Sequence, residues 1–151
     1  MLEPSENTGL TPKLGLPMLF AGQAQKEFFI NQALTMIDTC LFPVIDEARS
    51  GPPDVVEQGA AYLVVGPASG AWSGQDGRLA ISVGGDWIFV EPQSGMRVFD
   101  RDAGCFRLFR SGWQRAEAIL PPSGGSVIDA EARSAINAII AVLDTHGFFA
   151  N

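Results

Sequence analysis

The pattern of hydrophobic residues changes character twice along the chain and predicts three zones. Near the N-terminus, apolar residues recur at helical spacing and predict a helix over residues 23–40, ended by Pro43. The stripe expected to face the core is Ile30, Leu34, Ile37 and Leu41, with Asn31, Gln32 and Asp38 lying off it. Residues 1–22, punctuated by proline and glycine, are expected to form an extended arm.

Short apolar runs separated by glycine-containing turns fill the middle zone. The runs are 61–65, 79–83, 87–90, 96–99, 106–109 and the segment around Trp113. Strands at this spacing predict an antiparallel β-meander, closed as a small barrel or stacked as a sandwich. The residues expected in the core of this region and of the first helix are Leu34, Ile37, Leu79, Ile81 and Phe106.

Two of these strands carry apolar groups on both faces, with arginines between aromatic residues. A small sheet usually leaves one face in water, so the second face is expected to meet another sheet, the first helix or a neighbouring subunit. The candidate interface residues in these strands are Arg97, Phe99, Arg107 and Phe109.

The third zone begins with a linker, residues 121–126, and continues as a C-terminal helix within residues 127–151. Asp129 is the expected N-cap, and the helix is expected to stop at Gly147. Its apolar stripe packs either on the protein's own sheet or on a partner chain, and Ile136, Ile139, Ile140 and Leu143 are the candidate contacts. The expected fold is therefore α+β, mainly β, with residues 23–120 as the helix-plus-meander domain.

Composition and charge exclude several classes of protein. A hydrophobic content of 46% and a charged content of 18% are typical of a globular domain. A net charge of −7 has the wrong sign for a protein that follows nucleic-acid phosphates. The start lacks the basic and apolar regions of a secretory signal, and no apolar run approaches the ~20 residues of a membrane span. We therefore expect synthesis in the cytoplasm, with no nucleic-acid partner and no membrane insertion.

The sequence offers no catalytic residue, cofactor site or metal site that stands out. His146, the one histidine, falls in the last turn of the C-terminal helix, where a capping role is expected. Cys40 and Cys105 lie far apart and are expected to be free thiols. Five carboxylates of the sheet region leave a polysaccharide hydrolase open as a third interpretation, although no pair is singled out: Asp76, Asp86, Glu91, Asp100 and Asp102.

Four aromatic residues next to turns or strand ends are candidate sugar contacts. They are Tyr62, Trp72, Trp87 and Trp113. Exposed amphipathic rings can stack on pyranose faces, whereas buried rings would simply cover the ends of a small core. This pattern makes a carbohydrate-binding module that recognises capsular polysaccharide the alternative interpretation.

Several motifs resemble a known family. The segment Leu14-Gly15-Leu16-Pro17, the run Gln23-Ala24-Gln25-Lys26-Glu27, Asn31 and Asp38 are similar to the opening of domain-of-unknown-function family 2793. The resemblance continues through Pro52-Pro53, Tyr62-Leu63-Val64, Gly70-Ala71-Trp72 and Trp87, and covers roughly residues 11–115.

This resemblance implies a context rather than a reaction. Members of the family occur in prophages and gene-transfer-agent clusters, where they are associated with head spikes or fibres of the particle. The expectation is a non-enzymatic structural component of a phage-like particle, at the virion surface, which attaches to the host cell. Its expected partners are copies of itself in rotational symmetry, capsid or spike proteins, and cell-surface polysaccharide.

Overall fold

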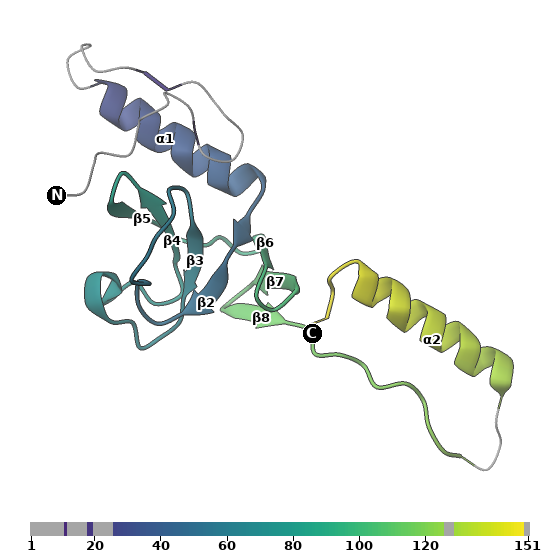
Figure 1. Ribbon diagram of the computed structural model, residues 1–151. Coiled ribbons are helices and arrows are strands. Elements are labelled where there is room, and N and C mark those ends of the chain that lie inside the picture. The colour runs from purple at the N-terminus through teal and green to yellow at the C-terminus, as the bar shows by residue number, and fades with distance from the viewer. Residues whose placement is uncertain (1–10, 12–17, 20–25, 126–128, 150–151) are drawn as a thin grey trace. The chain divides into compact units, whose positions relative to one another are not determined.

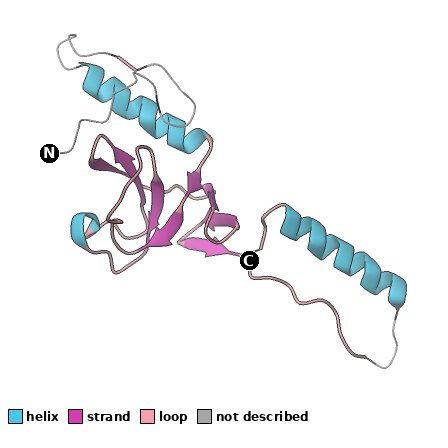
Figure 2. Ribbon diagram, in the orientation of Figure 1, coloured by secondary structure: helices cyan, strands magenta, loops and turns pink. Residues whose placement is uncertain are grey.

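In the part of the chain that the structure describes, two α-helices and eight short strands form the α+β, mainly β fold expected from the sequence (Figures 1 and 2). The computed structural model describes residues 11, 18–19, 26–125 and 129–149. Most of the expected arm at 1–22, the first residues of the expected helix at 23–25 and residues 127–128 lie outside this described part. The chain divides into two compact units, residues 1–92 and 93–151, and this boundary falls within the region 23–120.

The first unit holds one helix and a four-stranded sheet. Its elements are α1 (Lys26–Leu41), β1 (Val44–Ile45), β2 (Glu47–Arg49), β3 (Ala61–Val64), the short 3-10 helix η1 (Gly70–Trp72), β4 (Leu79–Val83) and β5 (Asp86–Val90). The strand order is β2-β3-β4-β5, with β3, β4 and β5 antiparallel as the meander prediction requires. The sheet has two free ends in this order and is not a closed barrel.

The strand β2 departs from the predicted meander. It pairs in parallel with β3, so that Glu47 lies opposite Tyr62 and Arg49 opposite Val64. The Nη1 of Arg49 lies 2.7 Å from Oε1 of Glu47, and its Nε donates to the carbonyl of Gly51 at 2.7 Å. This strand is short and polar, and its two charged side chains form one local ion pair.

A two-residue turn sets the register of β4 and β5. Val83 pairs with Asp86 across Gly84 and Gly85, whose φ angles are +61° and +89°. Two successive positive φ angles match the right-handed twist of a hairpin and are readily adopted only by glycine.

The two central strands of this sheet, β3 and β4, are buried on both faces. Leu79 and Ile81, 1% and 0% exposed, confirm the predicted core positions on one face. The intervening Ala80 and Ser82 are buried as well, so β4 is covered on both sides. Ala80 packs in a cluster with the aromatic residues Tyr62, Trp72, Trp87 and Phe89.

The second unit contains β6 (Arg97–Asp100), β7 (Cys105–Phe109), β8 (Trp113–Arg115) and α2 (Ala130–Thr145). The three strands are antiparallel neighbours in the order β6-β7-β8. After α2 the chain returns to this sheet. The amide of Phe106 donates to the carbonyl of Gly147 at 2.7 Å, and Phe149 forms a parallel bridge with Ala116.

The ends of α2 confirm the predictions made from its sequence. Asp129 is the N-cap, and its Oδ1 accepts a hydrogen bond of 2.9 Å from the amide of Ala132. His146 is the C-cap residue, and Gly147 follows with a φ of +69°. An aspartate at the N-terminus and a left-handed glycine just past the C-terminus are typical helix boundaries.

Two predicted core residues are instead exposed. Ile37 on α1 and Phe106 on β7 are 48% and 41% exposed, whereas Leu34 is half-buried. The expectation that the apolar stripe of α1 faces the core is therefore wrong, and the reason lies in which side of the helix is covered.

Candidate functional site

The aromatic cluster of the first unit is a core rather than a surface. Tyr62, Trp72 and Trp87 contact one another with ring centroids 5.0–5.9 Å apart. Tyr62 is 7% exposed and Trp72 is 0% exposed, whereas Trp87 is half-buried. The indole Nε1 of Trp72 is buried and has no hydrogen-bond acceptor among the described residues.

This burial corrects the expectation that the rings near the strand ends form a sugar-stacking surface. Tyr62 and Trp72 offer no exposed face, and Trp113 belongs to the other unit, where its ring packs on Phe109 with centroids 5.3 Å apart. Burial also raises the pKa of the Tyr62 phenol, and the carboxylate of Asp46 raises it further. Tyr62 and Trp72 are therefore core residues and cannot stack on a sugar ring.

The polar side of α1 is the side that is buried. Thr35, Asp38 and Thr39 are all at most 3% exposed. The Asn31 side chain forms two hydrogen bonds of 2.8 Å with the backbone of Leu19, one accepted from its amide and one donated to its carbonyl. Buried polar groups need such partners, and here the backbone of a preceding segment supplies them. This arrangement turns the apolar stripe outward.

Several large apolar side chains on the other side of α1 are therefore exposed. With their exposed fractions, they are Phe29 (70%), Ile30 (45%), Ile37 (48%), Leu41 (58%) and the adjacent Phe42 (63%). Residues 28–45 contribute no exposed charge to this surface, because Asp38, the one charged residue among them, is buried. We call it the α1 surface.

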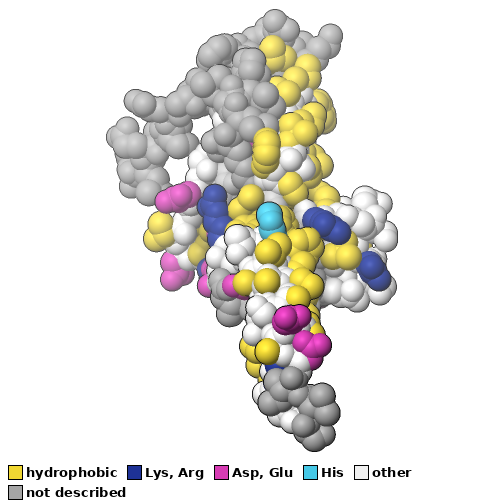
Figure 3. Space-filling view, turned by 90° about the vertical axis from the view of Figure 1, so that its right-hand side faces the viewer, with side chains coloured by type: hydrophobic (Ala, Val, Ile, Leu, Met, Phe, Trp, Pro, Cys, Tyr) yellow, Lys and Arg dark blue, Asp and Glu magenta, His cyan; other side chains and the backbone are white. Residues whose placement is uncertain are grey.

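The helix α2 presents a second surface of this kind. None of its residues is buried, and Ile136, Ile139 and Val142 are 43%, 59% and 56% exposed. Ten consecutive residues, 134–143, include no charged side chain. We call this stripe the α2 surface. Figure 3 shows hydrophobic side chains, in yellow, lying openly on the face of the molecule that it views.

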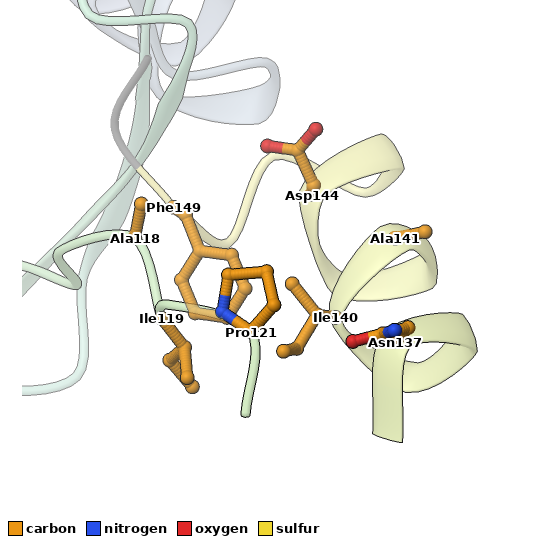
Figure 4. Close-up of a pocket in the computed structure, with 8 residues that line it drawn as sticks. All are labelled: Ala118, Ile119, Pro121, Asn137, Ile140, Ala141, Asp144 and Phe149. Carbon is orange, nitrogen blue, oxygen red and sulfur yellow. The ribbon is translucent and has the colours of Figure 1, made fainter. Parts of the chain in front are cut away.

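The opposite side of α2 faces the linker and the C-terminal return. A pocket of about 320 Å³ lies between them, and in Figure 4 Pro121 lies between the ring of Phe149 and the side chain of Ile140. Arg133 ties the linker to the helix, because its guanidinium donates to the carbonyls of Pro122 and Gly124. The linker is thus bonded to α2 along part of its length, and only one side of the helix is engaged.

The predicted interface residues on the second sheet fall on its two faces. Cα pairing places Val98 opposite Arg107, and Phe99 opposite Phe106. Arg107 is held by a buried carboxylate, since its Nε lies 2.6 Å from Oδ2 of Asp100, which is 1% exposed. Phe99 packs edge-on against Phe106, with centroids 5.2 Å apart. Arg97 is exposed and joins the pocket described next.

A second pocket of about 320 Å³ opens on the sheet of the second unit. Four arginines contribute to its lining: Arg97, Arg107, Arg110 and Arg115. Its apolar wall includes Phe106 and Phe148, which are 41% and 43% exposed. No acidic residue is among the described residues that line it. We call it the arginine pocket.

Three of the five candidate hydrolase carboxylates, Asp76, Glu91 and Asp100, have structural partners. Asp100 holds Arg107, Glu91 lies 2.8 Å from Nε of Arg78, and Asp76 accepts from the amide of Ala68 at 2.8 Å. In residues 26–125 and 129–149, no three His, Cys, Asp or Glu side chains are grouped so that they could hold a metal ion.

Both cysteines are free thiols, as predicted. Cys105 is 0% exposed, and burial raises the pKa of its thiol, an effect that the nearby Arg107 guanidinium partly opposes. A buried thiol with a raised pKa is a poor nucleophile, so its environment favours packing over reactivity.

The described part of the chain is thus a mainly β protein with exposed apolar side chains on α1 and α2 and with the arginine pocket on its second sheet. A family model described as a protein of unknown function, DUF2793, matches residues 30–114, and the chain belongs to this family. The matched region runs from α1 into β8 and ends before α2. No curated protein matches the chain. None of the helices in the described part is long and apolar enough to cross a membrane.

The arginine pocket was not predicted as a unit from the sequence. The sequence predicts Arg97 and Arg107 at an interface but does not single out Arg110, Arg115 or Phe148. Phe148 reaches the sheet only because the chain returns after α2, and that return has no local sequence signal. The alternation of arginine with aromatic residues in 97–109 was the one signal that pointed to this surface.

Proposed function

We propose that this protein is a non-enzymatic structural component of a phage-like particle, which associates with copies of itself and serves as the base or anchor of a head spike or fibre. The observation that carries the proposal is the α2 surface, a helix face without charge and without a buried residue. A 16-residue helix is marginal on its own in water, so contacts outside the helix must stabilise it.

The α1 surface and the α2 surface have the residue spacing of helices that pack on copies of the same chain. The apolar residues Ile30, Leu34, Ile37 and Leu41 of α1 are spaced four, three and four residues apart. In α2, Ala132, Ile136, Ile139 and Leu143 have the same spacing. Alternation of three and four is the spacing at which helices pack side by side along a seam. Homo-oligomers of closed symmetry bury such faces against identical ones.

Resemblance to the family supports the particle context. Its members occur in prophages and gene-transfer-agent clusters, and the chain shares their motifs across the α1 region and the first sheet. Attachment to the host cell surface is the part of the proposal that follows from a position on a spike or fibre.

The experiment that tests self-association compares two aspartate variants by sedimentation velocity across a range of concentrations. Ile139→Asp places a charge at the centre of the α2 surface, and we expect it to reduce the oligomer to a smaller species. Ser134→Asp is the matched control, because Ser134 is exposed on the same helix but lies about 140° around it from the centre of the stripe.

Both variants should keep the circular dichroism spectrum of the wild type, since neither residue is buried. A wild-type protein that stays monomeric at high concentration contradicts self-association. Electron microscopy of particles that carry a labelled copy of the chain tests the location, and particles without label contradict the structural role.

A further inference from the structure

We infer that the arginine pocket is a binding site for a saccharide that bears a carboxylate, such as a uronic acid unit. The inference deepens the attachment part of the proposed function and rests on it for its biological setting. All residues that line the pocket belong to the second unit.

Charge is concentrated in this pocket against the trend of the chain. Residues 1–92 contain eleven acidic and four basic side chains and carry the whole net charge of −7, whereas 93–151 contain six of each. Within the second unit, Arg107 forms an ion pair with Asp100, and Nε of Arg115 lies 3.5 Å from Oε1 of Glu117. Arg97 and Arg110 are exposed and have no carboxylate partner in residues 26–125 and 129–149. These two guanidinium groups are available to an anion.

The sheet register places further binding groups beside Arg97. Leu108 lies opposite Arg97 on one side and opposite Gln114 on the other, so the three residues form one row across β6, β7 and β8. The next row on the same face of the sheet contains Phe99 and Phe106. The segment that follows α2 adds Phe148 to the pocket. A charged group, an amide and two exposed phenyl rings therefore line one pocket.

This combination matches the chemistry of an acidic sugar. Guanidinium groups bind carboxylates through paired, charge-assisted hydrogen bonds. The Gln114 amide can donate to and accept from hydroxyls, and the exposed rings of Phe106 and Phe148 can contact the C–H face of a pyranose. A simple inorganic anion would use the arginines but would leave both rings without a partner. The volume of about 320 Å³ lies at the lower end of ligand sites and suits a single sugar unit.

The test is calorimetric titration of the full chain with trigalacturonate, with the neutral maltotriose and inorganic sulfate as comparison probes. We expect trigalacturonate to bind and maltotriose not to bind. Arg97→Gln and Arg110→Gln should each weaken binding of trigalacturonate about ten- to hundredfold, the usual effect of losing a hydrogen bond to a charged group. Arg101→Gln is the matched control, because Arg101 is also exposed but does not line the pocket.

Four results would each overturn the inference. They are no binding of trigalacturonate, equal binding of maltotriose, sulfate binding as tight as that of the sugar, and binding that survives both Arg97→Gln and Arg110→Gln. A fifth result would come from sedimentation velocity of Arg97→Gln and Arg110→Gln. If either substitution dissociated the oligomer, the pocket would be a contact between subunits and not a sugar site.

Titration of Ile139→Asp separates this inference from the proposed function. Sugar binding by a dissociated Ile139→Asp protein shows that the site stands without the assembly. An intact wild-type oligomer that binds no trigalacturonate overturns the site and leaves the structural role standing.

Discussion

At the scale of single residues, Trp72 combines two opposed contributions to stability. Its side chain is fully buried against Tyr62 and Trp87, which favours the folded state through apolar burial and ring contacts. Its Nε1 is buried without an acceptor among the described residues, which disfavours the folded state. With 0% exposure, this aromatic residue contributes to the core and offers no face to a ligand.

Substitutions at Trp72 separate the two contributions. Trp72→Ala should lower the free energy of unfolding by about 3–5 kcal/mol, because it leaves a cavity between two rings. Trp72→Phe should lower it by about 1–2 kcal/mol, because it keeps an aromatic ring and removes the unpartnered N–H. Urea denaturation followed by circular dichroism measures both.

Trp87→Phe serves as the control, since Trp87 is half-buried and belongs to the same cluster. Equal losses for the Ala and Phe variants of Trp72 would show that the ring does not fill this space.

At the scale of elements, α2 is held by its ends and by one side. The cap at Asp129, the bonds from Arg133 to the linker and the return through Gly147 fix the helix to its own unit. The opposite side stays uncovered. A helix held in this way presents its apolar stripe in a defined direction, which is what association with a partner requires.

The return after α2 depends on Gly147. A Cβ at this position would lie 3.0 Å from Cε2 of Phe99, at a φ of +69° that other residues rarely adopt. Gly147→Ala should therefore lower the free energy of unfolding by about 1–2 kcal/mol. It should also speed amide hydrogen exchange at Phe106, whose amide bonds to the Gly147 carbonyl.

Gly124→Ala separates strain from the clash, because Gly124 has a φ of +76° with open space around it. If Gly124→Ala and Gly147→Ala have the same effect on exchange at Phe106, the contact with Phe99 plays no part.

The elements that could be predicted from the sequence are those whose signals are local. Alternation in Leu79–Val83, the Gly84-Gly85 turn and the Asp129 cap each identified an element that the structure contains. The burial of α1 could not be predicted from periodicity, because the apolar stripe and the polar stripe of Asn31, Thr35 and Asp38 both have helical spacing. The hydrogen bonds between Asn31 and Leu19 decide which stripe turns inward, and they join residues 12 positions apart.

The arginine pocket shows the same limit at the level of the site. Its residues come from three strands and from the segment after α2, and their proximity depends on strand register and on the return at Gly147. Composition identified arginines among aromatic residues, but it did not distinguish Arg107, which Asp100 holds, from Arg97, which has no carboxylate partner in the described part of the chain. Pairing of charges is a tertiary property and has no counterpart in the local pattern.

At the scale of the whole molecule, each compact unit contains a buried weak acid whose pKa is raised. Burial raises the pKa of Tyr62 above its ordinary value of 10.0 in the first unit, and that of Cys105 above 9.0 in the second. In both cases the folded state favours the protonated, neutral form. Alkaline pH therefore acts on both units through different residues.

The sign of the effect on stability follows from proton binding. As pH rises above 9.0 for Cys105 and above 10.0 for Tyr62, the unfolded chain releases its proton before the folded chain does. The free energy of unfolding must then fall with increasing pH, and the stabilisation present below these values is lost as pH passes through the raised pKa of each group.

Chemical denaturation at intervals from pH 7 to pH 11 measures this fall. Cys105→Ala should flatten the curve above pH 9 and Tyr62→Phe above pH 10, whatever each variant does to stability at pH 7. A Tyr62→Phe curve that runs parallel to that of the wild type above pH 10 would show that the phenol ionises equally in both states, and the same reasoning applies to Cys105 one unit lower.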